Sequence, residues 1–401
     1  MRAAIDAESR LLIIAVSGMA ALALALGLGR FAYTAVLPMM QADQGLNLTD
    51  ASWLAIVNQI GYLVGGLTAA WFRHQPAKHA RRCLVLITFT MLAMGLSGDL
   101  AVWLFMRFIT GVASAWMMVM ISILCLPRLA LAPRLAGWVY AGVGSGIAVG
   151  GLICLAFVLI DGSSSNAWIA LALVCAFLAW PVWRTFVRDD DVVLSNTYER
   201  QVWSQQQAST PHQTRLWILV ICYGLYGFGY ILPATFLPAQ ARVLLEAHWI
   251  YSTAWPVFGL AAAASTLLAA RLATKVGQLP TWIGAHILMA IGVLVPVVWP
   301  ELWGVLIAAL CVGGTFVVIT LLAMQQAQQF GGVQAGLWMA RLTTAFAAGQ
   351  VLGPSAVVAL EGRLEPGMWL AAGVLLVSAG MLSIQHRRDK AVAAHSNHHS
   401  G

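Results

Sequence analysis

Twelve long apolar stretches occupy most of this chain, and they constrain its fold more than any other feature. All fifteen carboxylates lie outside the interiors of these stretches, whereas Arg30, Arg107 and Arg341 lie within them. A charge in the middle of a bilayer is costly unless a bundle interior or a cavity accommodates it. The pattern predicts a polytopic membrane protein with cationic and no anionic groups in its spans, which suits a carrier of anions.

The composition excludes a soluble globular domain. Hydrophobic residues make up 60% of the chain and charged residues only 9%, compared with about 25% charged in an ordinary soluble domain. The six cysteines fall within apolar stretches and none has metal-ligand spacing, so we expect no disulfides, no metal site and no cofactor. The stretch from Leu11 to Gly29 is too long for the core of a secretory signal, so we expect it to stay as the first span.

Each stretch should be helical, because hydrocarbon leaves backbone groups no partner outside their own helix. Most stretches contain the ~20 apolar residues needed to cross ~30 Å of hydrocarbon. The predicted fold class is therefore an all-α polytopic membrane protein with twelve transmembrane helices. The spans are expected near residues 11–40, 50–72, 83–98, 100–126, 136–160, 166–187, 215–240, 248–273, 281–300, 301–327, 334–360 and 366–386.

Lysine and arginine placement predicts the orientation. Counting alternate connecting segments from the N-terminus, one side holds seventeen of these residues and the other side only Arg242 and Arg363. By the positive-inside rule, both termini are expected to be cytoplasmic and the number of spans even. The positive charge is spread over six short segments, which argues against a nucleic-acid partner.

The longest polar segment divides the spans into six and six. We predict an N-terminal six-helix half at residues 1–187, a cytoplasmic linker at 188–214, a C-terminal six-helix half at 215–386 and a cytoplasmic tail at 387–401. The linker contains no nucleotide-binding loop, which argues against a pump driven by ATP.

Two sequence patterns recur in the same order in the two halves. Residues 29–33 of the first span correspond to 226–230 of the seventh, and residues 146–151 of the fifth span correspond to 349–354 of the eleventh. Ordered matches of this kind indicate a parallel repeat about an axis along the membrane normal.

These features resemble the major facilitator superfamily over nearly the whole chain. Residues 107–115, with Arg107 followed by Gly111, are similar to the family's span-four motif. Residues 271–277 resemble its cytoplasmic loop motif, with Thr274 where an acid is usual. The resemblance implies two six-helix halves, the major facilitator fold, and a transporter rather than an enzyme.

A narrower resemblance is to the YbfB/YjiJ-like subgroup. It is carried by residues 27–34 with Pro38 in the first span, by residues 227–230 in the seventh and by residues 343–350 in the eleventh. This resemblance implies the fold and little about the chemistry of the substrate.

Polar and aromatic residues within the spans form the candidate substrate site. Arg30 and Arg107 both lie toward the outer ends of their spans, so we expect them to approach each other. Two guanidinium groups repel each other when no carboxylate lies between them. An anion that accepts bidentate hydrogen bonds from both groups would relieve the repulsion. The alternatives are that Arg107 braces carbonyls of a neighbouring helix and that Arg341 reaches the lipid headgroups. The predicted substrate-binding residues are Arg30, Tyr33, Asn58, Gln59, Arg107, Tyr223, Tyr226, Tyr230 and Arg341.

Glycines recur at four-residue intervals at positions 142, 146 and 150, and again at 61 and 65. Such faces let helices approach closely. The resemblance implies that the second and eleventh helices, and the fifth and eighth, meet between the halves. We expect these glycine faces to lie there and to let the halves rock, although a static bundle would use the same glycines for packing.

Taken together, these features predict a secondary active or facilitative transporter that moves a small organic anion across a bacterial inner membrane by alternating access. An alternative is an efflux transporter for a drug, a siderophore or an amphiphilic metabolite. An alternative of another class is a non-transporting membrane sensor or scaffold. The expected partners are an anionic small-molecule substrate and the lipid bilayer, with the protein acting as a monomer.

Overall fold

The computed structural model describes residues 2–187, 211–244, 248–359 and 364–398. Within these ranges the regular structure is helical throughout. The elements are α1 (Arg2–Leu22), the π-helix η1 (Ala23–Leu28), α2 (Ala32–Asp43), α3 (Leu48–Ala69), η2 (Ala70–Phe72), α4 (Pro76–Leu96), α5 (Leu100–Cys125), α6 (Pro133–Leu159), α7 (Ser164–Val187), α9 (Pro211–Leu244), α10 (His248–Val276), α11 (Gln278–Val298), α12 (Leu302–Gly331), η3 (Gly332–Gln334), α13 (Ala335–Ala359) and α14 (Leu364–His398).

The described residues contain eleven continuous segments that are long and apolar enough to cross a membrane. One of these segments, Trp303–Pro354, comprises two helices, α12 and α13. They are separated at Gly332, whose φ of +52° is a left-handed conformation that glycine adopts without strain. The first span comprises α1, η1 and α2. The predicted twelve-helix fold is therefore confirmed.

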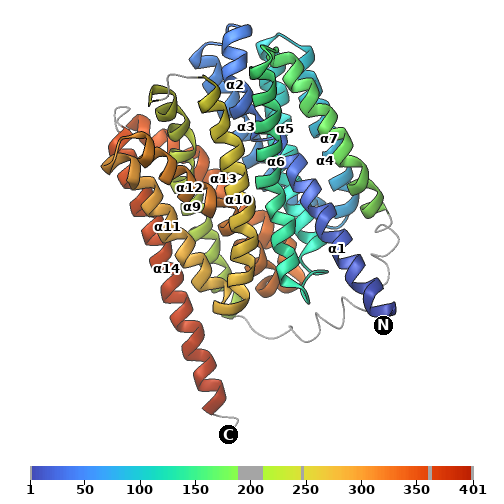
Figure 1. Ribbon diagram of the computed structural model, residues 1–401. Helices are drawn as coiled ribbons and strands as arrows, with labels where there is room; N and C mark the ends of the chain where they lie inside the picture. The colour runs from blue at the N-terminus through green and yellow to red at the C-terminus, as the bar shows by residue number, and fades with distance from the viewer. Residues whose placement is uncertain (1, 188–210, 245–247, 360–363, 399–401) are drawn as a thin grey trace.

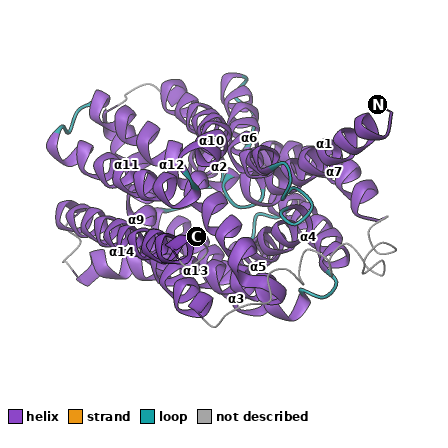
Figure 2. Ribbon diagram, turned by 90° about the horizontal axis from the view of Figure 1, so that it is seen from below, coloured by secondary structure: helices purple, strands orange, loops and turns teal. Residues whose placement is uncertain are grey.

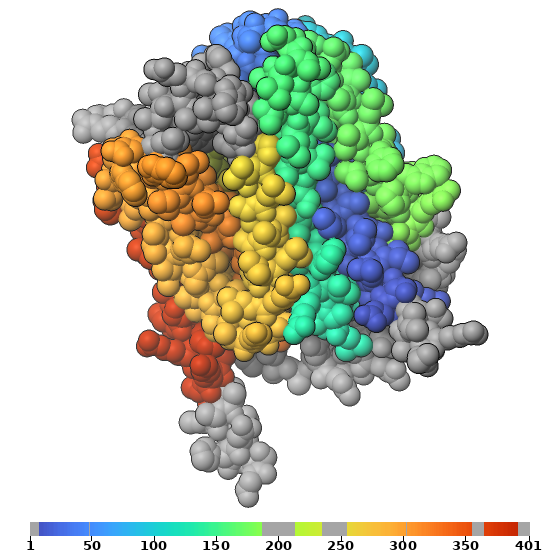
Figure 3. Space-filling model, viewed as in Figure 1, coloured from blue at the N-terminus to red at the C-terminus, as the bar shows by residue number. Residues whose placement is uncertain are grey.

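The two halves lie side by side (Figure 2). The helices from α1 to α7 form one half and those from α9 to α14 form the other. Between the halves, α6 packs along α10 and α3 packs along α13, as the family resemblance implied. The space-filling view shows α10 lying against α6 down one face of the molecule (Figure 3).

The chain enters and leaves the bundle at one end. The start of α1 and the end of α14 lie at the same end, and α14 projects beyond the other helices (Figure 1). Most of the predicted linker lies outside the described residues, and α9 already begins at Pro211. The predicted tail continues α14 as a helix as far as His398.

Polar residues at the opposite end cap the helices. Asn47 accepts a hydrogen bond from the backbone amide of Asp50 at the start of α3 (2.8 Å), and Asp99 accepts one from Val102 at the start of α5 (3.0 Å). Asp43, at the end of α2, accepts from the backbone amide (2.5 Å) and the hydroxyl (2.8 Å) of Ser164 at the start of α7. These side chains satisfy amides that have no partner within their own helix.

The four-residue glycine repeats lie within the N-terminal half. A Cβ atom at Gly142 or Gly146 would collide with backbone atoms of the first span, and one at Gly61 or Gly65 would collide with the backbone of α5. The expectation that these faces lie between the two halves was wrong. Four-residue spacing shows that one side of a helix is smooth, and it does not show which neighbour that side meets.

A different set of glycines faces the other half. Gly137, Gly144 and Gly151 recur every seven residues along α6, and all three point toward α10. A Cβ atom at Gly144 would come within 3 Å of backbone atoms of Gly259 and Ala263. These three glycines make the α6 surface smooth at the boundary between the halves. The sequence therefore contained a seven-residue glycine repeat on α6 in addition to the more conspicuous four-residue repeat.

Candidate functional site

The first span is broken next to Arg30. The π-helix η1 ends at Leu28, and a turn precedes the start of α2 at Ala32. The amide of Gly29 donates to the oxygen of Leu24 (2.8 Å), and the oxygen of Ala25 instead accepts from the hydroxyl of Ser114 on α5 (2.7 Å). Single π-turns within α-helices occur frequently at functional sites. Here the break places a cation between two helical pieces in the interior of the bundle.

Arg107 on α5 braces this break. Its Nη1 and Nη2 atoms donate to the backbone oxygens of Gly29 and Arg30, each at 3.3 Å. Its guanidinium lies over the ring of Tyr33, with 4.7 Å from Cζ to the ring centroid. Asn58 donates in turn to the backbone oxygen of Arg107 (2.8 Å). The two arginines lie next to each other, as predicted, and the hydrogen bonds of Arg107 go to backbone oxygens.

Arg30 connects the two halves of the protein. Its side chain is 4% exposed, and its Nη2 donates to the side-chain oxygens of Gln59 on α3 and Gln350 on α13. Its guanidinium lies over the ring of Tyr62, 3.8 Å from the centroid. Among the described residues, no carboxylate forms an ion pair with Arg30. A buried cation is thus shared by neutral amides from opposite halves.

Aromatic rings surround this cation. Tyr223, Tyr226 and Tyr230 follow one another along α9, with ring centroids 5.3 and 5.9 Å apart. Phe346 on α13 stacks on Tyr223 and Tyr226 at 5.2 and 5.1 Å, and meets Tyr62 of the other half edge-on at 6.3 Å. Arg30 interacts electrostatically with these three tyrosines, with Tyr62 and with the neighbouring Arg107.

The tyrosine hydroxyl groups have partners within the bundle. Tyr223 donates to the hydroxyl of Thr320 (3.0 Å), and Tyr226 donates to the backbone oxygen of Phe316 (2.8 Å). Tyr33 donates to the backbone oxygen of Ala51 (2.8 Å). Because their hydroxyl groups are already hydrogen-bonded, these three tyrosines contribute mainly their rings to the site.

The structure brings together eight of the nine predicted site residues and separates one. Arg341 lies on a different side of α13 from Gln350, between Trp217 and Trp338. Sequence reasoning also left three residues out of the site: Tyr62, Phe346 and Gln350. Two signals were available, because Tyr62 lies one turn after Gln59 on α3 and Gln350 is a polar residue inside a span.

Comparisons with known proteins agree with this fold. Residues 22–383 match the family described as "Uncharacterised MFS-type transporter YbfB". No protein with a curated description matches the chain significantly.

Two solved structures are similar over almost their whole length. The human organic anion transporter MFSD10 (TETRAN) has 15% identity, with 94% of this chain and 99% of that chain covered and a TM-score of 0.69. The proton:xylose symporter XylE, bound to 6-bromo-6-deoxy-D-glucose, has 13% identity, with 92% and 94% covered and a TM-score of 0.66. At these identities the likeness concerns the fold alone.

Proposed function

The chain belongs to the major facilitator superfamily, in the YbfB-type group, and from this premise we propose that it moves a small organic anion across the membrane by alternating access. Membership makes it a multi-pass transporter of a small molecule in a lipid bilayer. The observation that carries the anion proposal is Arg30, a buried cation held by amides from both halves.

The two glutamines that bind Arg30 behave differently when the halves move apart. Gln59 belongs to the same half as Arg30 and stays beside it, whereas Gln350 leaves with α13. Arg30 then loses a charge-assisted hydrogen bond worth about 1.5–3 kcal/mol. A carboxylate or phosphate ligand replaces that acceptor with two parallel hydrogen bonds. Gln350 thus occupies the place of the anion while the site is closed.

The surroundings of Arg30 favour an anion with an apolar or aromatic part. The rings of Tyr62, Tyr223, Tyr226 and Phe346 provide apolar and stacking surface, and aromatic pairs prefer such offset or edge contacts. Arg107 contributes positive charge next to the site while it keeps its hydrogen bonds to the backbone oxygens of Gly29 and Arg30. The proposed ligand therefore has one acidic group and a ring or alkyl portion.

The boundary between the halves supports the proposed rocking motion. Three glycines of α6 face α10, and a Cβ atom at Gly66 of α3 would meet Thr344 of α13 at 3.0 Å. Close backbone contact without interlocking side chains allows one half to tilt against the other around a central site. Both termini and the linker are proposed to be cytoplasmic in a bacterial inner membrane. One chain contains the whole site, so we propose a monomer.

Thermal stability of the purified protein in detergent tests anion binding. We expect aromatic and aliphatic carboxylates to raise the melting temperature, and the corresponding uncharged amides to leave it unchanged. Arg30→Gln should lose the response and Arg30→Lys should keep a weak one, because lysine supplies charge without the fork. Arg271→Gln, at an exposed arginine of α10, is the matched control and should respond like the wild type. Equal stabilisation by amides, or a full response in Arg30→Gln, would contradict the proposal.

A further inference from the structure

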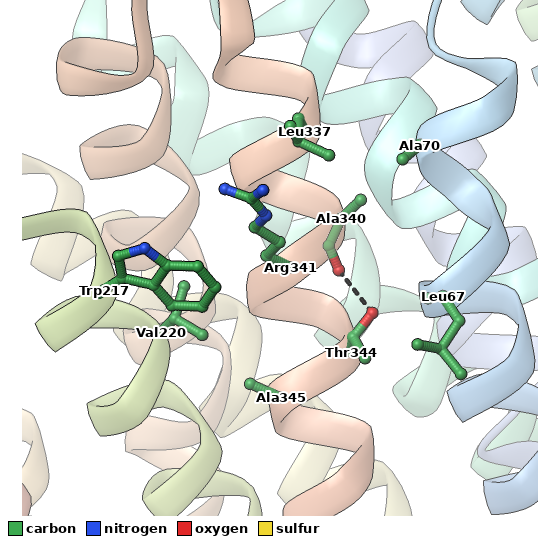
Figure 4. A pocket seen from close by; sticks show the side chains of 10 residues that line it. Leu67, Ala70, Trp217, Val220, Leu337, Ala340, Arg341, Thr344 and Ala345 are labelled. Carbon is green, nitrogen blue, oxygen red and sulfur yellow. Dashed lines mark hydrogen bonds between the residues drawn. The ribbon is translucent and has the colours of Figure 1, made fainter. Parts of the chain in front are cut away.

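A groove of about 310 Å³ lies between α3 of one half and α9 and α13 of the other (Figure 4). Most of its lining is apolar, and Arg341 is the charged residue in it. Its volume is at the lower end of the ~300–1,000 Å³ that is usual for small-molecule sites. The groove is separate from the Arg30 site, whose contacts on α13 are Phe346 and Gln350.

The groove opens toward the lipid. Leu67 and Trp217, on its two sides, are 59% and 49% exposed. Leu352, which is three turns after Arg341 and on the same side of α13, is 60% exposed. In a membrane-spanning bundle, apolar side chains exposed in this way contact hydrocarbon. The occupant of the groove is therefore expected to come from the bilayer.

Arg341 has no acceptor for its hydrogen-bond donors in the described part of the chain. Its guanidinium lies 5.0 Å from the ring centroid of Trp217 and 4.4 Å from that of Trp338. These two rings meet edge-on at 5.3 Å. A guanidinium has five N–H donors in a planar fork, and stacking on aromatic rings satisfies none of them. This partly exposed guanidinium is therefore free to donate to an anionic acceptor from the membrane.

The position of Arg341 along α13 suits a lipid headgroup. The helix begins at Ala335, so Arg341 lies about 9 Å along its axis, at 1.5 Å per residue. Figure 4 shows its guanidinium reaching along α13 toward the level of Leu337. Leu337 lies near the start of the helix, and we expect that end to be the one nearer the membrane surface. Tryptophan is enriched at this depth, where its ring meets headgroups and chains together.

We propose that this groove binds an anionic phospholipid. The headgroup phosphate accepts hydrogen bonds from the Arg341 guanidinium beside the two tryptophans, and an acyl chain lies along Leu67 and Val220. Basic pockets between transmembrane helices recognise anionic headgroups in this way. Because α3 and α13 belong to opposite halves, the lipid binds only the conformation in which these helices are adjacent, and it shifts the population toward that conformation.

Native mass spectrometry of the purified full-length protein tests the site, with phosphatidylglycerol and phosphatidylcholine added in equal amounts. We expect the wild type to retain phosphatidylglycerol preferentially. In Arg341→Gln the amount of phosphatidylglycerol adduct should be at least tenfold lower. Arg341→Lys should retain part of it. Ala70→Trp, which fills the groove and keeps the charge, should lose the adduct as well. Arg271→Gln should match the wild type.

Three results would overturn the proposal. They are an undiminished adduct in Arg341→Gln, an undiminished adduct in Ala70→Trp, and an equal loss in Arg271→Gln, which would mean that any exposed arginine gives the signal. Size-exclusion chromatography checks that each variant is folded. If Arg341→Gln does not fold, Arg341→Lys still tests the site. The outcome is independent of whether Arg30 binds an anion.

Discussion

Replacing Gln350 with alanine should tighten the binding of an organic anion. Gln350 accepts a hydrogen bond from Arg30 across the boundary between the halves, and the ligand must displace it. Such a bond to a charged group contributes about 1.5–3 kcal/mol, and water that reaches Arg30 in the open site offsets part of this. A remaining gain of about 1.4 kcal/mol corresponds to a tenfold lower Kd.

Gln59 is the matched control for Gln350. Both side-chain oxygens accept from Nη2 of Arg30, but Gln59 lies in the same half and is not displaced when the halves separate. Gln59→Ala should therefore weaken anion binding or leave it unchanged. Isothermal titration calorimetry with one carboxylate from the thermal-shift screen measures both variants under the same conditions.

Gln350→Glu should have the opposite effect and weaken anion binding. A carboxylate beside Arg30 would attract it by about 4 kcal/mol at 4 Å and an effective dielectric constant near 20, before the cost of burying the new charge. We expect at least tenfold weaker anion binding and a higher melting temperature without ligand. Displacement of Gln350 by the ligand is refuted if Gln350→Ala and Gln59→Ala change the affinity in the same direction and to the same extent.

Three further predictions concern Arg107, the boundary between the halves, and the topology expected from the lysine and arginine distribution. Arg107→Gln should lower the melting temperature, since it leaves buried carbonyls of Gly29 and Arg30 without donors at about 1–3 kcal/mol each; an unchanged melting temperature would remove its role as a brace. Gly144→Val should abolish transport in proteoliposomes while still inserting, whereas Gly150→Ala, whose nearest contact would be a side chain at 3.2 Å, should transport normally. A single cysteine in the predicted linker should be labelled only from the cytoplasmic side. Labelling in intact cells by an impermeant reagent would contradict this topology.

Much of the architecture was predictable because lipid imposes strong rules on a sequence. Apolar length predicts the spans, and the absence of carboxylates from their interiors makes the intramembrane arginines conspicuous. The neighbouring positions of Arg30 and Arg107 followed from their similar depth. The shared face of the three α9 tyrosines followed from helical periodicity.

The remaining features depend on tertiary contacts that no local pattern encodes. α13 is apolar on several sides, so periodicity does not show that Gln350 faces the centre while Arg341 faces the lipid. The π-turn at η1 lies in a run of alanine, leucine and glycine that is equally compatible with a regular helix. The bond between Arg30 and Gln350 joins residues 320 positions apart.

Exchange transport in proteoliposomes is the most direct test of Arg30 as the anion site of an alternating-access carrier. Vesicles preloaded with an unlabelled organic anion that stabilises the wild type are placed in a trace of the same anion carrying a label. Wild-type protein should accumulate the label, Arg30→Lys should do so slowly and Arg30→Gln should not, at equal protein content. The uncharged amide of the same compound should not exchange. Exchange by Arg30→Gln at the wild-type rate would contradict the account.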